Sequence, residues 1–334
     1  MSDRFKSSPL DDASFGAALS GEAGAQGFVA AAEADPTAML DTFYAADGLL
    51  LVPGMQGITS DPGLLLRLSR LFGPEVENYD DTLMSANQIH PDVREIFIVS
   101  NAPPVDRPPP PLPEPPLTED GRLPVQFPHR RGWHTDQSYR RPPPDVSLFL
   151  AVIPAPEGQG QTLFADGRAA YAALTEDMKA RIEGMDGIHA KPRTGRSERE
   201  VLAGEQPHPT APHERPQRQP LVRQHPVTGE KSLYLCEGGQ MDWADGPIAG
   251  MAPGPGGDGA KLLYELMSHM TSDRFTYAHH WRAGDLVIWD NRSLLHSATW
   301  FDTETCDRVM WRTTVHGNPG SEYAGEAKSW VPAA

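Results

Sequence analysis

The apolar residues of this chain fall mostly in short blocks typical of β-strands, and few segments show helical spacing. Strands are predicted at residues 48–52, 145–152, 231–235, 274–281, 285–290 and 307–315. Helices are predicted at residues 35–43 and 62–71, and around the stripe Leu262, Leu263, Leu266, Met267 and Met270. Many strands with few helices favour a mainly β fold of the α+β type. The expected core is a double-stranded β-helix (jelly roll) with flanking helices.

Three stretches lack this patterning. Residues 1–30 are rich in Ala, Gly and Ser, and we expect them to wrap the surface. Residues 102–120 contain four consecutive prolines, which donate no backbone hydrogen bonds, so a polyproline-like surface insertion is expected; a peptide-ligand role is the alternative. Residues 190–225 are too long for an ordinary connection and are predicted to form an active-site lid. All three would belong to one domain spanning residues 1–334.

The charge balance narrows the choice of partners. The chain has 334 residues with 29 Lys and Arg against 45 Asp and Glu, a net charge of −16. This disfavours nucleic acid and anionic membranes as partners. No apolar run approaches the roughly 18 residues of a membrane span, and the start of the chain does not resemble a signal peptide. Two cysteines are too few for a disulfide framework, so we expect a cytoplasmic protein with inert thiols.

Candidate metal ligands occur in the segment Trp133-His134-Thr135-Asp136. In extended backbone, residues i and i+2 share a face, so His134 and Asp136 would point the same way and Thr135 the other. A third ligand, His296, follows a predicted buried strand and turn. Two imidazoles and one carboxylate form the facial triad that holds non-haem Fe(II). A His-x-Asp pair alone is weak evidence, because Asp136 could cap a turn and His134 could be a core histidine.

Two arginines add to this signal. Arg308 and Arg312 share one face of a predicted strand, whereas Val309 and Trp311 occupy the other. A buried guanidinium needs an anion, and its planar fork suits a carboxylate. A structural salt bridge is the alternative for Arg308.

These residues belong to a longer ordered pattern. It comprises Trp133 to Asp136, Gly160-Gln161-Thr162-Leu163, His225-Pro226-Val227-Thr228-Gly229-Glu230-Lys231 with Leu233-Tyr234, Gly284-Asp285 through Trp289-Asp290-Asn291-Arg292, His296, and Arg308 with Arg312. Over roughly residues 40–320 the chain thereby resembles the taurine/2,4-dichlorophenoxyacetate dioxygenase family of Fe(II)- and 2-oxoglutarate-dependent oxygenases.

The resemblance implies roles for individual residues. His134, Asp136 and His296 would bind Fe(II), and Arg308, helped by Thr162, would pair with the distal carboxylate of the cosubstrate 2-oxoglutarate. Arg312 would serve either the cosubstrate or an anionic substrate, and Thr162 could instead be an ordinary strand threonine. With O2, and ascorbate as an aid in vitro, such a site releases succinate and CO2. Because Asp136 is not replaced by Ala or Gly, hydroxylation is favoured over halogenation.

The substrate is less well defined by the sequence. Asn78, Arg131, Tyr139 and Arg312 are candidates to bind a small organic anion, although Arg131 could equally be a surface residue. The histidine that taurine enzymes carry near Asn78 is absent, which argues against taurine. Relatives commonly form dimers or tetramers, so a homo-oligomer is expected. Alternatives are a tailoring hydroxylase or desaturase of an amino acid or natural-product intermediate, and a non-catalytic jelly-roll binding protein.

Among the other histidines, His225 belongs to a Pro-Gly turn and is expected to order a loop or an interface. His279 and His280 are adjacent on a strand and must face opposite ways, so one is expected at the surface and the other against the sheet.

Overall fold

The computed structural model describes residues 5–20, 24–82, 85–316, 323, 326, 328 and 329. Its largest sheet has eight strands in the order β1-β2-β3-β13-β6-β15-β4, with β5 also paired to β15. The strands are β1 (Ser7–Pro9), β2 (Ala17–Leu19), β3 (Leu49–Val52), β4 (Glu75–Val76), β5 (Phe97–Ser100), β6 (Val146–Ile153), β13 (Leu286–Asp290) and β15 (Val309–His316). All pairings are antiparallel except β2 with β3.

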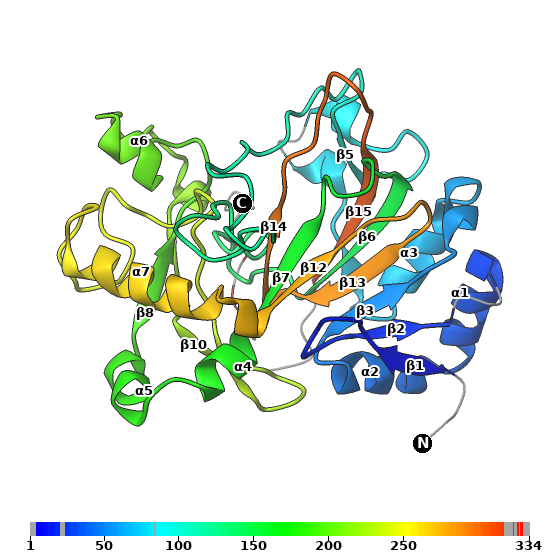
Figure 1. Ribbon diagram of the computed structural model, residues 1–334, viewed down its shortest axis with the longest axis horizontal. Coiled ribbons are helices and arrows are strands. Elements are labelled where there is room, and N and C mark those ends of the chain that lie inside the picture. The colour runs from blue at the N-terminus through cyan, green and yellow to red at the C-terminus, as the bar shows by residue number, and fades with distance from the viewer. Residues whose placement is uncertain are drawn as a thin grey trace.

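A smaller antiparallel sheet packs against the large one. It has the order β12-β7-β14, with bounds Thr276–His279, Thr162–Asp166 and Leu294–Ala298. Phe164 of β7 and Leu294 of β14 pack in one apolar cluster with Phe149, Trp289 and Met310 of the large sheet. The Phe164 and Trp289 rings lie 5.6 Å apart between their centroids. The two sheets therefore face each other across a shared core. Figure 1 shows the strands of both sheets near the middle of the molecule.

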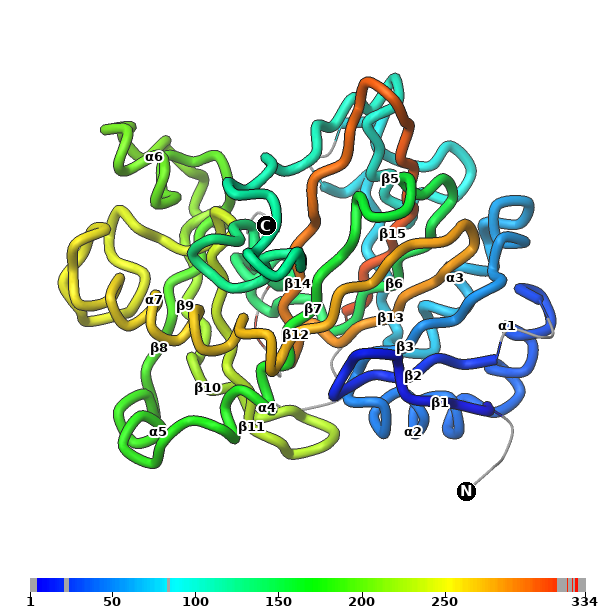
Figure 2. The backbone as a smooth tube through the Cα atoms, viewed as in Figure 1, coloured from blue at the N-terminus to red at the C-terminus, as the bar shows by residue number. Residues whose placement is uncertain are grey.

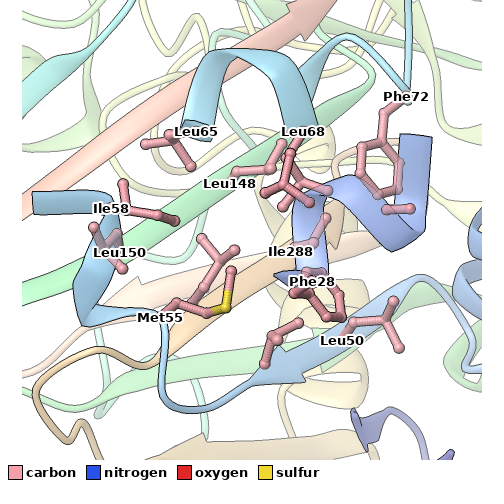
Figure 3. Packing of buried hydrophobic residues seen from close by; sticks show 14 of the residues in the cluster. Phe28, Leu50, Met55, Ile58, Leu65, Leu68, Phe72, Leu148, Leu150 and Ile288 are labelled. Carbon is pink, nitrogen blue, oxygen red and sulfur yellow. The ribbon is translucent and has the colours of Figure 1, made fainter. Parts of the chain in front are cut away.

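Helices α1 (Gly24–Ala34), α2 (Pro36–Ala45) and α3 (Gly63–Ser69) cover the other face of the large sheet. Leu65 and Leu68 of α3 and Phe28 of α1 pack against Leu148 and Ile288 of the sheet, as Figure 3 shows. Helix α2 begins where Asp35 accepts a hydrogen bond from the Ala38 amide and Pro36 takes the first position. The predicted helices at residues 35–43 and 62–71 are confirmed.

A second group of helices covers the smaller sheet. It comprises α4 (Gly167–Ala172), α5 (Glu176–Ile182) and α7 (Asp258–Met270), on the side of the molecule opposite α1 to α3 (Figure 1). The predicted apolar stripe of α7 is wholly buried and packs with Leu163 and Leu295 of the sheet. Two hairpins adjoin this region, β8 (Asp186–His189) with β9 (Gln217–Pro220), and β10 (Val222–Gln224) with β11 (Lys231–Leu233).

Single turns of 3-10 helix complete the described secondary structure. They are η1 (Gln56–Thr59), η2 (Tyr79–Asp81), η3 (Ala86–Gln88), η4 (Pro212–Glu214) and η5 (Asp273–Phe275). No helix within the described ranges is long and apolar enough to cross a membrane.

The expectation that residues 1–30 wrap the surface is wrong for part of this stretch. Strand β2 pairs with β3, and Phe28 and Val29 of α1 are buried in the core. Strand β2 has three residues, which is too short to show a periodicity. Helix α1 contains many alanines, which favour a helix but do not produce a strongly apolar face. Only part of the stretch, including β1, is exposed.

The two predicted insertions differ from each other. Residues 102–120 contain neither helix nor strand, as their prolines predict. Residues 190–225 contain α6 (Glu198–Leu202), η4, β9 and β10, so this segment is more regular than its composition suggests. Figure 2 traces the long connection from β5 to β6, drawn in cyan to green, that carries the first insertion.

Candidate metal centre

Two strands that are distant in sequence position the candidate ligands. His296 lies in β14, and His134 forms an isolated antiparallel bridge with it. The amide of each histidine donates to the carbonyl of the other, at 2.9 Å from His134 and 2.7 Å from His296. Asp136 follows two residues later, where the chain leaves the bridge. Between them, the Thr135 hydroxyl points away and donates to the Asn291 carbonyl at 2.8 Å, as the alternation predicts.

The side chains of His134, Asp136 and His296 converge. Their ligand atoms all lie within 4.8 Å of one another, and His296 Nε2 is 3.8 Å from Asp136 Oδ1. His134 Nδ1 donates to the Gly132 carbonyl at 2.7 Å, which leaves the Nε2 lone pair of His134 free for a metal. Two imidazoles and one carboxylate in this arrangement fit a divalent transition metal such as Fe(II).

The protonation states also suit a metal. Burial lowers the pKa of His134, and burial together with the neighbouring His134 lowers the pKa of His296 to about 3. Burial alone would raise the pKa of Asp136, but Arg312 and the two histidines lower it to about 2. At neutral pH the histidines are therefore neutral and Asp136 is ionised, which is the state that metal ligation requires.

The turn between β13 and β14 orients Asp136. Asn291 Oδ1 accepts from the Asp136 amide at 3.3 Å and from the Trp289 indole at 2.9 Å. Asn291 Nδ2 donates to Ser147 Oγ, which itself donates to Asp136 Oδ2 at 2.7 Å. One buried asparagine thus links the carboxylate to two strands of the large sheet.

Arg308 is a buried cation without a carboxylate partner in the described part of the chain. Its side chain is 5% exposed, and its Nε has no hydrogen-bond partner. Burial, followed by the charge of Arg107, lowers the pKa of Arg308 to about 10. The Cζ atom of Arg308 lies 5.8 Å from the ring centroid of Phe149 and 5.8 Å from that of Phe301. A bound anion from outside the chain, such as a carboxylate, would offset the free-energy cost of burying the Arg308 charge.

Thr162 and Gly160 adjoin this cation. The Thr162 hydroxyl accepts from the Trp281 indole at 3.0 Å, which leaves its own proton available to an anion. Gly160 has a φ of +63°, and a Cβ there would lie 2.8 Å from Ala155 Cβ and 3.3 Å from Arg308 Nε. Only glycine allows the turn to approach Arg308 this closely.

Arg312 is paired with a metal ligand. Its Nη1 donates to Asp136 Oδ1 at 2.5 Å, and this carboxylate raises the pKa of Arg312 despite burial. Buried Glu77, whose charge also raises the pKa of Arg312, binds Arg140 at 2.6 Å and Gln137 at 2.8 Å. Burial opposes ionisation of Glu77, but His316 and Arg140 lower its pKa to about 2.

The substrate candidates fare differently. Arg131 is bound by Glu198 at 2.8 Å and Glu237 at 3.3 Å, and its guanidinium stacks on Phe127. This pairing argues against the predicted substrate role of Arg131, which instead ties α6 to the His134 segment. The Asn78 side chain accepts from the Asp80 amide at 3.0 Å and caps η2. Tyr139 is half-buried three residues after the ligand Asp136, and burial raises its pKa.

His225, His279 and His280 lie as the sequence indicates. His225 Nδ1 accepts from the amides of Val227 and Thr228, and its Nε2 is 2.9 Å from Asp290 Oδ2, so it orders the Pro-Gly turn. His279 is buried in β12, and His280 is exposed.

Three residues near the site were not anticipated from the sequence. Asn101 accepts from the Arg308 amide at 2.7 Å and donates to the Cys306 carbonyl, which fixes the start of β15. Trp281 binds Thr162, and Arg107 acts electrostatically on Arg308 and His134. Each contact joins segments that are far apart in the sequence, so local patterns do not predict it. The one local indication is that Asn101 is a polar residue directly after strand β5.

Comparison with known proteins agrees with this geometry. Residues 7–314 match the model of the taurine catabolism dioxygenase TauD, TfdA family. The chain is 37% identical over 198 residues to the (S)-phenoxypropionate/alpha-ketoglutarate-dioxygenase of Sphingobium herbicidovorans, covering 58% of this chain and 64% of that protein. It is 32% identical over 247 residues to pentalenolactone F synthase of Streptomyces arenae, covering 71% of this chain and 75% of that protein.

Among solved structures, AAD-2 in complex with Mn(II) and N-oxalylglycine superposes with a TM-score of 0.66 at 26% identity, over 95% of this chain and 98% of that one. The sequence match to the phenoxypropionate dioxygenase spans less than two thirds of that relative's length. The family match spans nearly the whole of this chain. The chain therefore belongs to the taurine catabolism dioxygenase TauD, TfdA family.

Proposed function

We propose that this protein is an Fe(II)- and 2-oxoglutarate-dependent dioxygenase that hydroxylates a C–H bond of a small organic anion. The observation that carries the proposal is the convergence of His134, Asp136 and His296 beside the buried, carboxylate-free Arg308. A structural salt bridge would account for a buried arginine, but no carboxylate partner is recorded for Arg308 among the described residues. The two facing sheets support a jelly-roll core in a single domain, since the large sheet combines strands from both ends of the described chain.

Each side chain has a part in this activity. His134 and His296 would offer their Nε2 atoms to iron, and Asp136 one carboxylate oxygen. Arg308 would bind the distal carboxylate of 2-oxoglutarate, and Thr162 would donate its hydroxyl proton to the same group. When bound, Fe(II), 2-oxoglutarate and O2 supply the oxidising power that places oxygen in the substrate and releases succinate and CO2. Arg312 would keep Asp136 ionised and oriented.

We infer further that the substrate carries a carboxylate. Two relatives are named for phenoxypropionate and 2,4-dichlorophenoxyacetate, and both of these compounds are carboxylates. The likeness to pentalenolactone F synthase favours a second candidate, a tailoring enzyme that oxidises a natural-product intermediate. Both candidates use the same metal site and differ in the group that fills the space around it.

A direct assay tests the proposed chemistry. Purified protein with Fe(II), 2-oxoglutarate and ascorbate is given aryloxyalkanoates and polycyclic natural-product acids while O2 uptake and succinate are measured. We expect at least one acid to stimulate both, and its product to gain one oxygen atom; loss of two hydrogens would identify a desaturase. Absence of O2 uptake with every compound, in protein that binds Fe(II), would favour the non-catalytic binding protein.

A further inference from the structure

Trp281 follows β12 and packs in the apolar cluster that the two sheets share. Its indole N–H donates to the Thr162 hydroxyl at 3.0 Å, and its ring packs edge to face on Phe149 of β6, with 5.5 Å between the ring centroids. The centroid of Phe149 in turn lies 5.8 Å from Arg308 Cζ. Trp281 therefore contacts Thr162 of the small sheet directly and adjoins Arg308 of the large sheet through Phe149.

The hydrogen bond from Trp281 restricts the Thr162 hydroxyl. A hydroxyl has one proton and two lone pairs, and the Trp281 N–H occupies one of the lone pairs. An indole N–H donates and cannot accept, so the Thr162 proton must point elsewhere. Thr162 is 3% exposed, and no acceptor for this proton is recorded among the described residues. The hydroxyl is thus left with a buried donor for a bound anion.

A buried histidine holds the Trp281 ring in place. His279 packs on it at an interplanar angle of 90°, with 4.4 Å between the ring centroids. His279 pairs with Thr162 across β12 and β7, so their side chains lie on the same face of the small sheet. The Tyr277 hydroxyl lies 3.1 Å from His279 Nδ1, and His279 Nε2 lies 3.3 Å from Asp285 Oδ2. These two contacts fix the plane of the imidazole on which the indole packs.

The turn after Trp281 is anchored to the large sheet. The Gly284 amide donates to the Ala151 carbonyl of β6 at 2.8 Å, and the Ala151 amide donates to the Asp285 carbonyl at 2.9 Å. The side chain of Asp285 is the one that faces His279. The indole is therefore held between a histidine of the small sheet and a turn bound to the large sheet, and its N–H has one direction.

We infer that Trp281 is a positioning residue for the cosubstrate: its N–H occupies the Thr162 oxygen and thereby directs the Thr162 proton toward the distal carboxylate of 2-oxoglutarate. The inference rests on the proposed function. Without the indole N–H the hydroxyl is free to rotate, and part of the binding free energy must then go into orienting it. Trp281 acts on the cosubstrate through Thr162, which distinguishes it from a residue that only fills the core.

A double-mutant cycle on cosubstrate binding tests this role without turnover. The protein is loaded with Mn(II), and calorimetry measures its affinity for N-oxalylglycine, an inert analogue of 2-oxoglutarate. Trp281→Phe keeps an aromatic ring without the N–H and should weaken binding about three- to tenfold, the range of one hydrogen bond. Thr162→Val removes the hydroxyl and should weaken binding about 10- to 100-fold, because its partner is charged. In the Thr162→Val background, Trp281→Phe should change the affinity less than about twofold.

Controls separate orientation of the hydroxyl from a general loss of packing. Thr162→Ser keeps a hydroxyl, so Trp281→Phe should weaken binding in this background as it does in the wild-type protein. Trp243→Phe changes another buried indole, which packs edge to face on Tyr264 of α7, and should leave N-oxalylglycine affinity within about twofold of wild type. Mn(II) affinity should be the same in all variants, because the three metal ligands are intact.

The possible outcomes distinguish the two levels of interpretation. Wild-type affinity in Trp281→Phe, wild-type affinity in Thr162→Val, or an equal loss from Trp281→Phe in the Thr162→Val background would overturn the role of Trp281. The proposed function would survive each of these results. Failure of the wild-type protein to bind N-oxalylglycine with Mn(II) would instead count against the proposed function.

Discussion

At the scale of single residues, the candidate site depends on charges that are held in one protonation state. Burial keeps His134 and His296 neutral, and Arg312 keeps Asp136 ionised against the cost of its own burial. The hydrogen bond from His134 Nδ1 to Gly132 selects the tautomer with a free Nε2. These states exist before any metal arrives, so binding should release few protons at neutral pH.

Asp136→Ala should abolish tight Fe(II) or Mn(II) binding, because two imidazoles alone leave the triad incomplete. Calorimetric titration with Mn(II) measures this, and circular dichroism checks that the fold persists. Ser147→Ala, which removes one hydrogen bond to the carboxylate but keeps the carboxylate, should weaken the metal far less. Wild-type metal affinity in Asp136→Ala would refute the assigned triad.

Arg308→Ala should weaken 2-oxoglutarate binding by about 3–5 kcal/mol, the usual effect of breaking a buried charge pair. The dissociation constant of 2-oxoglutarate from the anaerobic Fe(II) complex measures the effect through the charge-transfer absorption of that complex. Arg308→Lys should recover part of the affinity, since it restores charge without the bidentate fork. An unchanged dissociation constant in Arg308→Ala would show that another cation binds the distal carboxylate of 2-oxoglutarate. Arg312 would be the first to test.

At the scale of elements, the turn Asp290-Asn291-Arg292 is the part that holds the ligands in register. The turn follows β13 of the large sheet and leads into β14 of the small sheet. It therefore connects the two sheets just before His296. The Asn291 side chain forms hydrogen bonds with Asp136, with Ser147 of β6 and with Trp289 of β13. The site is therefore assembled by packing of sheets and not by a single flexible loop.

Asn291→Ala should lower metal affinity 10–100-fold, as is usual when the groups that orient metal ligands are removed. It should also lower the free energy of unfolding by about 1–3 kcal/mol, since the buried Trp289 indole loses its acceptor. Metal titration and urea unfolding measure the two effects. Ser293→Ala, at the residue that follows this turn, is the matched control, and metal affinity equal to wild type in Asn291→Ala would show that Asp136 is oriented without Asn291.

At the scale of the whole molecule, buried titratable groups outside the metal ligands couple stability to pH. Burial lowers the pKa of His189 to about 3, below its ordinary value of 6.5. His316 and Arg140 hold the pKa of Glu77 at about 2, below its ordinary value of 4.5. As the pH falls below these ordinary values, the unfolded chain takes up protons that the folded chain refuses, so the fold loses stability.

The metal-free protein should therefore unfold at steadily lower temperature as the pH falls from about 6.5 toward 3. The contribution of His189 begins near pH 6.5, whereas that of Glu77 is added below about pH 4.5. His189→Gln should reduce the slope of the upper part of this profile, between about pH 6.5 and 4.5, in thermal scans monitored by circular dichroism; part of the slope should remain, because burial also lowers the pKa of His134 and His296. A slope identical to wild type in that window would show that His189 does not contribute to it.

The sequence predicts the elements of this molecule better than the contacts between them. Strand 285–290 and the stripe of α7 were predictable because their apolar residues follow one element's own geometry. The triad was predictable because His134 and Asp136 share one face of an extended segment, and because His296 and Arg308 follow them in a longer ordered pattern. Arg107 and Trp281 were not, because their roles follow from which strand ends meet in the fold. The assignments of a homo-oligomer and of cytoplasmic location stay predictions.

The mutual backbone bridge between His134 and His296 has a kinetic consequence. Both amides lie in hydrogen bonds at 2.9 and 2.7 Å between two ordered segments, so neither backbone segment can move away from the other without breaking them. Release of the metal by separation of these two segments would require the same local opening that lets the two amides exchange with deuterium. Hydrogen–deuterium exchange should therefore show the two amides opening together, and the rate of that opening sets an upper limit on metal escape by this route.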